Sequence, residues 1–204
     1  MSHANRAIGL LGGSFNPAHG GHLHISLYAL KTLGLDEVWW LVSPRNPLKS
    51  ADSLAAYEDR LCSAREIAAP YRSIRVLDIE ARMRSRYSYQ TLQMLKRRHP
   101  GMQFIWLMGA DNLASFHRWR RWEWLLASIP IVVFDRAPYS HTSLRSKAFV
   151  RAHKFLIKNA PIRGITAPAL LFVHLRRNPV SSTALRKTLG LFGFPSRANR
   201  LPSG

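Results

Sequence analysis

A glycine-rich turn between an apolar run and a leucine-patterned segment constrains the fold of this chain more than any other feature. The run Ala7-Ile8-Gly9-Leu10-Leu11 predicts a short buried strand. Leucines recur at helical spacing from Leu23 to Leu33, which predicts a helix that starts near His22. The turn itself, residues 12–22, reads Gly-Gly-Ser-Phe-Asn-Pro-Ala-His-Gly-Gly-His. Such turns bind phosphate, because backbone N–H groups and the helix dipole favour negative charge there.

The histidines of this turn add side-chain donors to the backbone ones. His19 and His22 stand three residues apart, and His24 follows them. A zinc site normally needs a further Cys, His or carboxylate ligand, and no acidic residue lies near in the sequence. We therefore expect an anion here rather than a metal. The alternative is a tight strand-to-helix connection that binds no ligand.

Strand and helix patterns alternate along the rest of the chain. Apolar runs without internal alternation indicate strands buried on both faces, and their alternation with helices indicates a parallel sheet. We predict an α/β fold, a Rossmann-like parallel sheet flanked by helices on both faces. A single domain is expected over residues 1–194, with a flexible tail at 195–204. The predicted strands are residues 8–11, 37–42, 74–77, 104–108, 131–134 and 170–175, and the predicted helices are 22–33, 53–68, 89–98, 122–127, 144–157 and 182–189.

The charge balance of the chain is strongly basic. Lysine and arginine number 30 against 11 acidic residues, which gives a formal charge of +19 over 204 residues. This excess fits a generally basic surface, an anionic small substrate or nucleic acid. Because the basic clusters are spread along the chain and do not form one arm, nucleic acid is the less expected partner.

The single cysteine and the lengths of the apolar runs bear on the compartment. Cys62 lies inside a helical pattern, so we expect a buried core thiol rather than a nucleophile. No apolar run reaches the length of a membrane span, and the N-terminal run stops too early for a signal peptide. These patterns predict a cytoplasmic protein.

Ligands of parallel α/β sheets bind beyond the carboxyl ends of the strands. The loops at that edge are residues 12–22, 43–49, 79–88, 109–122 and 175–183. In the last of them, Ser181 and Ser182 precede a predicted helix and Arg186 follows one turn later. The serines fit an ordinary helix N-cap, and together with the arginine they also fit a second phosphate site.

Three further loop residues have two interpretations each. Asp111 follows a strong strand, where it could cap a helix or accept hydrogen bonds from sugar hydroxyls. Trp119 fits a core residue or a stacking partner for a flat heteroaromatic ring. Lys49 fits a surface charge or a phosphate ligand. No Ser/His/Asp triad or carboxylate pair emerges, so this inventory favours nucleotidyl transfer by positioning and charge neutralisation.

Five segments, in order, resemble the motifs of bacterial nicotinate-mononucleotide adenylyltransferase, a family of the nucleotidyltransferase superfamily with an (H/T)xGH motif. Residues 12–22 resemble its signature turn, and together the matches span about residues 7–190. The other matching segments are residues 44–49, similar to a Pro-rich loop ending in Lys; 86–92, similar to SYTxDTL; 109–119, similar to GADxLxxFxxW; and 180–186, similar to ISSTxIR.

The resemblance implies a reaction and a set of site residues. The enzyme would transfer AMP from ATP to nicotinate mononucleotide, giving deamido-NAD and pyrophosphate in NAD biosynthesis. Attack would be in line, without a covalent intermediate, and Mg²⁺ would neutralise the ATP phosphates. The resemblance implies catalysis by His19 and His22; binding of ATP and its phosphates by Gly13, Ser14, Phe15, Ser181, Ser182, Arg186 and Asp111; mononucleotide binding by Lys49, Tyr87, Ser88 and Trp119; and no metal ligand from the protein.

The segment that resembles SYTxDTL departs from its pattern. Arg86, Ser88 and Gln90 replace Ser, Thr and Asp. Ser88 keeps the hydroxyl, whereas Gln90 loses a charge. The alternatives to nicotinate mononucleotide are nicotinamide mononucleotide or another phosphate acceptor such as phosphopantetheine. The alternative from a different class is a basic nucleic-acid-binding protein built on a nucleotide-binding fold.

Overall fold

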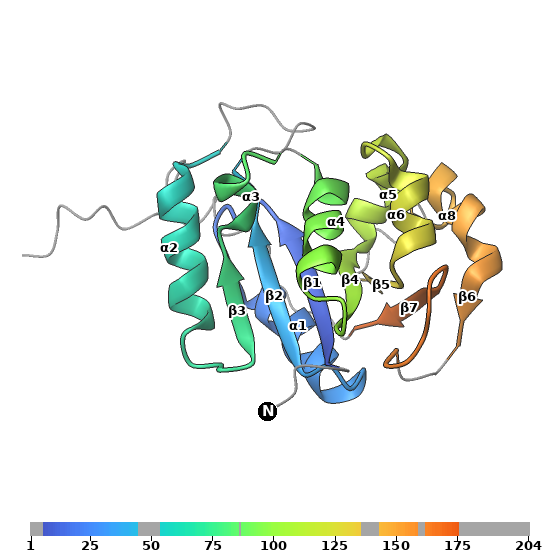
Figure 1. Ribbon diagram of the computed structural model, residues 1–204, viewed down its shortest axis with the longest axis horizontal. Coiled ribbons are helices and arrows are strands. Elements are labelled where there is room, and N and C mark those ends of the chain that lie inside the picture. Colours follow the sequence, from blue (N-terminus) through green and yellow to red (C-terminus); the bar gives the residue numbers. More distant parts are fainter. Residues whose placement is uncertain (1–5, 45–53, 86, 136–142, 159–161, 176–204) are drawn as a thin grey trace, which may run out of the picture.

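A parallel β-sheet forms the centre of the protein (Figure 1). The computed structural model describes residues 6–44, 54–85, 87–135, 143–158 and 162–175. Within these residues the sheet has seven strands in the order β3-β2-β1-β4-β5-β7-β6, and every neighbouring pair is parallel. The strands are β1 (Ala7–Gly13), β2 (Glu37–Val42), β3 (Ile74–Leu77), β4 (Gln103–Gly109), β5 (Ile131–Asp135), β6 (Leu156–Ile157) and β7 (Leu170–His174).

Helices cover both faces of this sheet. One apolar cluster joins the sheet to α1 and α2, and a second cluster on the other face joins it to α4, α5, α6 and α8. The prediction of a parallel α/β sheet with helices on both faces is therefore confirmed. The helices are α1 (Gly20–Thr32), α2 (Tyr57–Ala68), α3 (Ile79–Arg82), α4 (Ser88–Arg98), α5 (Ala110–Ser115), α6 (Trp122–Ser128) and α8 (Lys147–Ala152), with 3₁₀ turns at Phe116–Arg118 and His153–Phe155.

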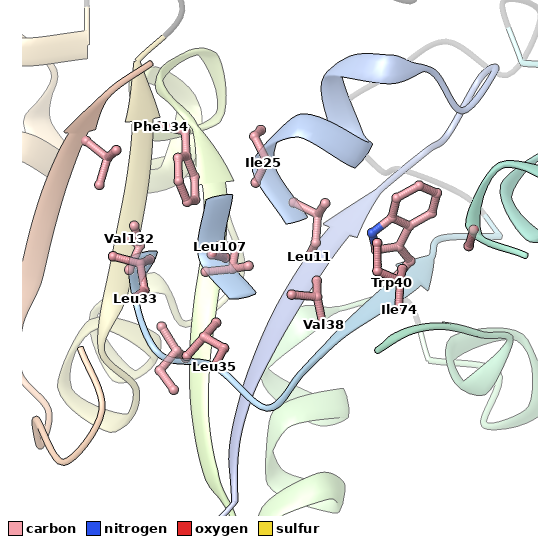
Figure 2. Close-up of a cluster of buried hydrophobic side chains, with 14 of the residues drawn as sticks. Leu11, Ile25, Leu33, Leu35, Val38, Trp40, Ile74, Leu107, Val132 and Phe134 are labelled. Carbon is pink, nitrogen blue, oxygen red and sulfur yellow. The ribbon is translucent and has the colours of Figure 1, made fainter. Parts of the chain in front are cut away.

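The central strands are apolar throughout because their side chains enter the two clusters alternately. On β2, Val38 and Trp40 pack on the side of α1 and α2, whereas Trp39 and Leu41 pack on the opposite side. Figure 2 shows the first cluster, in which Ile25 of α1 lies over the strands. Burial on both faces removes the hydrophobic–polar alternation that a half-exposed strand would show.

Two predicted helices have different bounds in the structure. The helix expected over residues 144–157 is limited to α8 at Lys147–Ala152, and after a 3₁₀ turn Leu156 and Ile157 pair with β7 as an edge strand. The apolar spacing of these residues serves sheet pairing, which no local pattern reveals. The helix expected from residue 53 begins at Tyr57. The helix expected at 182–189 and the tail at 195–204 lie outside the described residues.

The prediction that Cys62 is a buried thiol is wrong. Leu61 and Ala64 face the core from α2, but Cys62 lies one position further round the helix and is exposed. Its Sγ atom donates a weak hydrogen bond to Glu66 at 3.6 Å. A helical period identifies an apolar face, and Cys62 does not belong to that face.

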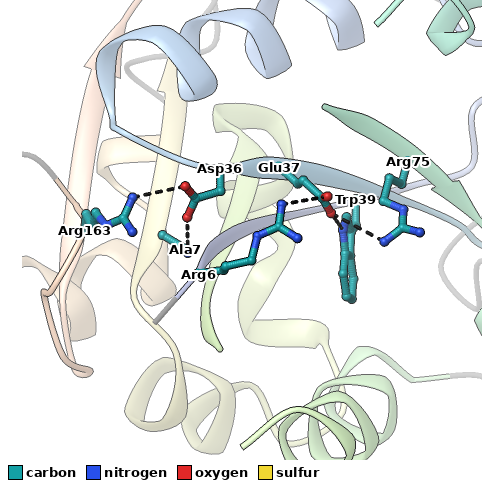
Figure 3. A network of polar contacts seen from close by, with 7 residues as sticks. All are labelled: Arg6, Ala7, Asp36, Glu37, Trp39, Arg75 and Arg163. Atoms are coloured by element: carbon teal, nitrogen blue, oxygen red, sulfur yellow. Dashed lines mark hydrogen bonds and ion pairs between the residues drawn. The ribbon is translucent and has the colours of Figure 1, made fainter. Parts of the chain in front are cut away.

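A polar network holds the amino ends of the first two strands together (Figure 3). The carboxylate of Asp36 accepts the backbone N–H of Ala7 at 2.7 Å and pairs with Arg163 at 3.2 Å. Burial alone would raise the pKa of Asp36, but the hydrogen bonds from Ala7 and Arg163 outweigh it and hold the pKa below its ordinary value. Glu37 beside it pairs with Arg6 at 2.8 Å. This network lies at the edge opposite the loops in which we expect the ligand.

None of the helices in the described part of the chain combines the length and apolar character needed to cross a membrane.

Candidate active site

The turn from β1 into α1 is held in an unusual backbone conformation. Phe15 has φ +47°, in the left-handed region that a bulky side chain rarely adopts and that costs about 1–3 kcal/mol. Its ring is buried and stacks on Trp40 at 5.1 Å, which holds the turn in place. A Cβ on Gly12 would lie 3.0 Å from Trp106. The turn is therefore built by packing, and glycine is needed where it passes the Trp106 ring.

His19 and His22 cap the N-terminus of α1 reciprocally. Nδ1 of His19 accepts the backbone N–H of Gly21 at 3.0 Å, and Nδ1 of His22 accepts the backbone N–H of His19 at 3.2 Å. The two rings lie 4.0 Å apart. Because each Nδ1 accepts a hydrogen bond, it carries no proton, and the proton of each neutral ring is on Nε2. The cap thus fixes one tautomer of both histidines, with Nε2–H as the donor.

Neighbouring aromatic residues fix the orientation of His22. Its ring lies 4.5 Å from that of Phe15 and 6.0 Å from that of Trp40. The indole N–H of Trp40 donates to the Ser26 hydroxyl at 2.8 Å, and this hydroxyl donates to the His22 carbonyl at 2.8 Å. The side chain and the backbone of His22 are therefore positioned by the same buried group of residues.

A buried arginine lies behind the turn. Arg60 of α2 is 1% exposed and donates to the backbone carbonyls of Ser14, Ser43, Pro44 and Ala55. Burial lowers the pKa of this guanidinium from its ordinary value. Arg60 was not predicted as a functional residue, because an arginine in a helix is normally solvated. The only local signal was its place beside Leu61 and four residues before Ala64, on the apolar face of α2.

A buried glutamate lies at the carboxyl edge of the sheet, where α3 follows β3 (Figure 1). Glu80 is 6% exposed, accepts a hydrogen bond from Thr91 of α4 at 3.3 Å and is also hydrogen-bonded to the Ser43 side chain. Burial raises its pKa to about 7, although both hydrogen bonds oppose the shift. Residues 79–88 were predicted only as a loop, and this carboxyl group was not among the predicted site residues.

Tyr87 and Ser88 lie where α4 begins. Tyr87 is the N-cap of this helix and is 36% exposed, and Ser88 is its first residue. Gln90, which departs from the family pattern, accepts a hydrogen bond from the Ser85 hydroxyl at 3.1 Å. The Tyr87 carbonyl lies 3.2 Å from the same hydroxyl, so the two acceptors share its single proton. Gln90 thus helps to order the loop that enters α4 without carrying a charge.

Asp111 and Trp119 follow the carboxyl end of β4. The N-cap of α5 is Gly109, so Asp111 is not the cap, and its side chain is exposed to solvent. Trp119 is half-buried and meets Trp106 edge-to-face at 5.9 Å and Phe116 at 5.3 Å. Its ring is held at a fixed angle while part of its surface stays accessible.

The structure places part of the expected site along one edge of the sheet. Gly13 ends β1, Ser14 and Phe15 lie in the turn that follows it, and His19 and His22 lie at the start of α1. Tyr87 and Ser88 follow β3, and Asp111 and Trp119 follow β4. Lys49, Arg86, Ser181, Ser182 and Arg186 lie outside the described residues. Among those that are described, no three His, Cys, Asp or Glu side chains gather in a way that could hold a metal ion. The arrangement can bind phosphate through a helix N-terminus and two histidine donors.

Solved structures and curated relatives resemble this chain. A Plasmodium falciparum nicotinic acid mononucleotide adenylyltransferase complexed with NaAD superposes with a TM-score of 0.68 at 18% identity, covering 90% of this chain and 84% of that one. At that identity the likeness shows the fold alone. A probable nicotinate-nucleotide adenylyltransferase of Erythrobacter litoralis is 50% identical over 184 residues, covering 88% of this chain and 83% of the relative.

Two further matches concern sequence. A probable nicotinate-nucleotide adenylyltransferase of Methylorubrum extorquens is 47% identical over 182 residues, covering 88% of this chain and 98% of the relative. Residues 10–188 match the cytidylyltransferase-like family. This match includes the turn after β1 and every described strand that follows it. The chain therefore belongs to the cytidylyltransferase-like family and, within it, to the nicotinate-nucleotide adenylyltransferases.

Proposed function

We propose that this protein transfers AMP from ATP to nicotinate mononucleotide, giving deamido-NAD and pyrophosphate. A phosphate oxygen of the mononucleotide attacks the α-phosphorus of ATP, and the bond from this phosphorus to the oxygen of the departing pyrophosphate breaks. The observation that carries the proposal is the reciprocal cap of His19 and His22 on a glycine-rich turn. This cap presents two neutral imidazole donors at a helix N-terminus, where phosphate binds.

The turn after β1 supplies the groups that act on ATP. His19 and His22 donate Nε2–H hydrogen bonds to its phosphates and stabilise the charge that develops in the transition state. Gly13, Ser14 and Phe15 line the nucleotide site with backbone groups. The Ser14 hydroxyl is buried and has no hydrogen-bond partner among the residues that the structure describes, which supports its use by a ligand.

The remaining loops supply the groups that bind the rest of the two substrates. Trp119 stacks on the pyridine ring, and its half-buried, fixed ring supports this role. Asp111 accepts hydrogen bonds from a ribose, which its exposed carboxylate supports. The roles carried over by family resemblance are carboxylate binding at Tyr87 and Ser88, contact of Lys49 with the mononucleotide phosphate, and pyrophosphate binding by Ser181, Ser182 and Arg186.

The divalent cation of the reaction enters with ATP. Enzymes that transfer nucleotidyl groups from ATP generally take it as a metal complex, and we propose Mg²⁺ for this one. The metal would neutralise the phosphates of the ATP to which it is bound, so it requires no cluster of protein carboxylates.

The test is pyrophosphate release from ATP and Mg²⁺, with nicotinate mononucleotide and nicotinamide mononucleotide compared in parallel at equal concentrations. The proposal expects a higher kcat/KM with the acid. A preference for the amide would keep the chemistry and overturn the assigned acceptor. No turnover with either would overturn the proposed function, and salt-dependent polynucleotide binding would then be measured.

A further inference from the structure

We propose that Arg60 is a positioning residue that holds the phosphate-binding turn in its active arrangement; this inference rests on the proposed function. Its guanidinium joins segments that are far apart in the sequence. Nη1 donates to the carbonyls of Ser14 and of Ser43, the latter at 2.8 Å. Nη2 donates to the Pro44 carbonyl at 2.9 Å, and Nε donates to the Ala55 carbonyl at 3.1 Å.

The same segments are also tied to each other directly. The backbone N–H of Ser43 donates to the Gly13 carbonyl at 2.9 Å, which continues the pairing of β1 and β2 past their ends. Asn16 accepts the backbone N–H of Ala55 through its side-chain oxygen at 3.1 Å. Arg60 therefore closes a ring of hydrogen bonds around the start of the turn. A shift of the guanidinium would move Ser14, and with it the backbone that leads to His19.

The chemistry of the contacts explains why arginine is used. A guanidinium offers five N–H donors in a rigid planar fork, whereas an ammonium offers three donors on a flexible stem. One group with a fixed fork can bind four carbonyls in a defined geometry. No acidic side chain pairs with Arg60 within the described part of the chain: its four hydrogen bonds all go to backbone carbonyls, and its guanidinium also lies 5.4 Å from the centre of the Tyr57 ring.

The alternative is that Arg60 only stabilises the fold. Mutation of another buried residue of α2, one whose side chain binds no loop carbonyl, distinguishes the two explanations. Leu61, the next residue, is 3% exposed and packs in the apolar core with Ala64. Leu61→Ala is thus the matched control, because it weakens the packing of the same helix and removes no hydrogen bond to the turn.

The experiment compares Arg60→Met, Arg60→Lys and Leu61→Ala at a temperature at which circular dichroism shows each variant folded. We expect Arg60→Met to lower kcat/KM by about 10²-fold, as expected for a displacement of about 1 Å in a positioned group. Arg60→Lys should recover only part of this loss, since it keeps the charge but not the fork. Leu61→Ala should lower Tm by about 10 °C and leave kcat within about twofold of wild type.

Backbone hydrogen exchange gives a readout that does not depend on turnover. The Ser43 amide should exchange faster in both Arg60 variants than in wild type and in Leu61→Ala. If Arg60→Met does not fold, Arg60→Lys decides the question with the same two measurements. Folded Arg60 variants with wild-type kcat/KM and wild-type exchange at Ser43 would overturn the proposal. If wild type itself shows no turnover with either mononucleotide, the proposed function fails, and unchanged exchange at Ser43 would still overturn the positioning role.

Discussion

His22 accepts the backbone N–H of His19 through Nδ1 at 3.2 Å, so the second histidine holds the backbone of the first. His19 in turn accepts from Gly21 at 3.0 Å. One nitrogen of each ring therefore stabilises the helix start, and the proposed function uses the other nitrogen. These two roles can be separated by mutation, because asparagine reproduces the position of Nδ1 but not that of Nε2.

His19→Asn should abolish most turnover and leave the stability of the protein nearly unchanged. Asparagine is among the best N-cap residues, so it can replace the hydrogen bond to Gly21. His19→Ala should lose turnover as well and also lower the free energy of unfolding by about 1 kcal/mol. Urea unfolding and kcat measured on both variants test this. Wild-type kcat in folded His19→Asn would show that the ring serves only as a cap.

Glu80 should make the stability depend on pH in the direction opposite to that of a salt-bridged carboxylate. Burial raises its pKa from an ordinary value of 4.5 to about 7 in the folded protein. Between these values the folded state keeps a proton that the unfolded state has lost, so the contribution to stability falls as pH rises from about 4.5 to about 7. Integrated over this window, the loss is of order 3 kcal/mol.

Glu80→Gln should remove this dependence. The variant and wild type should have similar free energies of unfolding at pH 5. At pH 8 the free energy of unfolding of the variant should be the higher one, because an amide has no proton to lose. Urea unfolding at the two pH values measures it, with exposed Glu58→Gln as the control on α2. Equal pH profiles for Glu80→Gln and wild type would contradict the buried, protonated state.

Trp119→Leu should raise KM for nicotinate mononucleotide by about tenfold and leave KM for ATP nearly unchanged. Stacking on a flat heteroaromatic ring is worth about 1–3 kcal/mol, and about 1.4 kcal/mol corresponds to a factor of ten. The control is Trp119→Phe, which keeps an aromatic face and should recover most of the affinity. An equal rise in both KM values would place the effect in the packing against Trp106 and Phe116 instead.

Asp36→Asn should destabilise the protein at neutral pH and leave kcat unchanged, because the network of Asp36 lies at the edge of the sheet away from the site (Figure 3). The pKa of Asp36 is held below its ordinary value of 3.8, so its contribution is present above that pH and is lost as pH falls through the folded-state pKa. We expect a loss of about 1 kcal/mol at pH 7 that shrinks toward pH 3. Thermal unfolding at pH 7 and pH 3 measures this loss of stability. A changed kcat would contradict the expectation that the Asp36 network does not affect the site at the other edge of the sheet.

Local sequence patterns predicted most of the sheet correctly. The expected strands at residues 37–42 and 74–77 coincide with β2 and β3, and the others differ from the structure by one or two residues at their ends. These strands were recognisable because both of their faces are buried and their apolar runs are continuous. The start of α1 was equally recognisable, because the glycine-rich turn and the leucine spacing are both local features.

The errors share one cause: contacts with residues distant in sequence decide whether a side chain is buried and which element a segment forms. Leu156 and Ile157 carry a helix-compatible pattern but pair with β7, and Cys62 lies on the outer face of α2. Arg60 and Glu80 were missed because a single charged residue in a sequence does not reveal whether it is buried.

The sequence by itself determined the strand-and-helix order, the phosphate-binding character of the turn after β1 and the motifs that identify the family, because each depends on residues close together in the chain. Only the tertiary structure decided which charged groups lie beneath that turn. The burial of Arg60 and Glu80 arises where the ends of β1, β2 and β3 meet α2 and α4, and hydrogen bonds to Ser43 connect both groups to this meeting point. The energy of a buried charge depends on the donors and acceptors that surround it, and the fold brings these together from segments tens of residues apart.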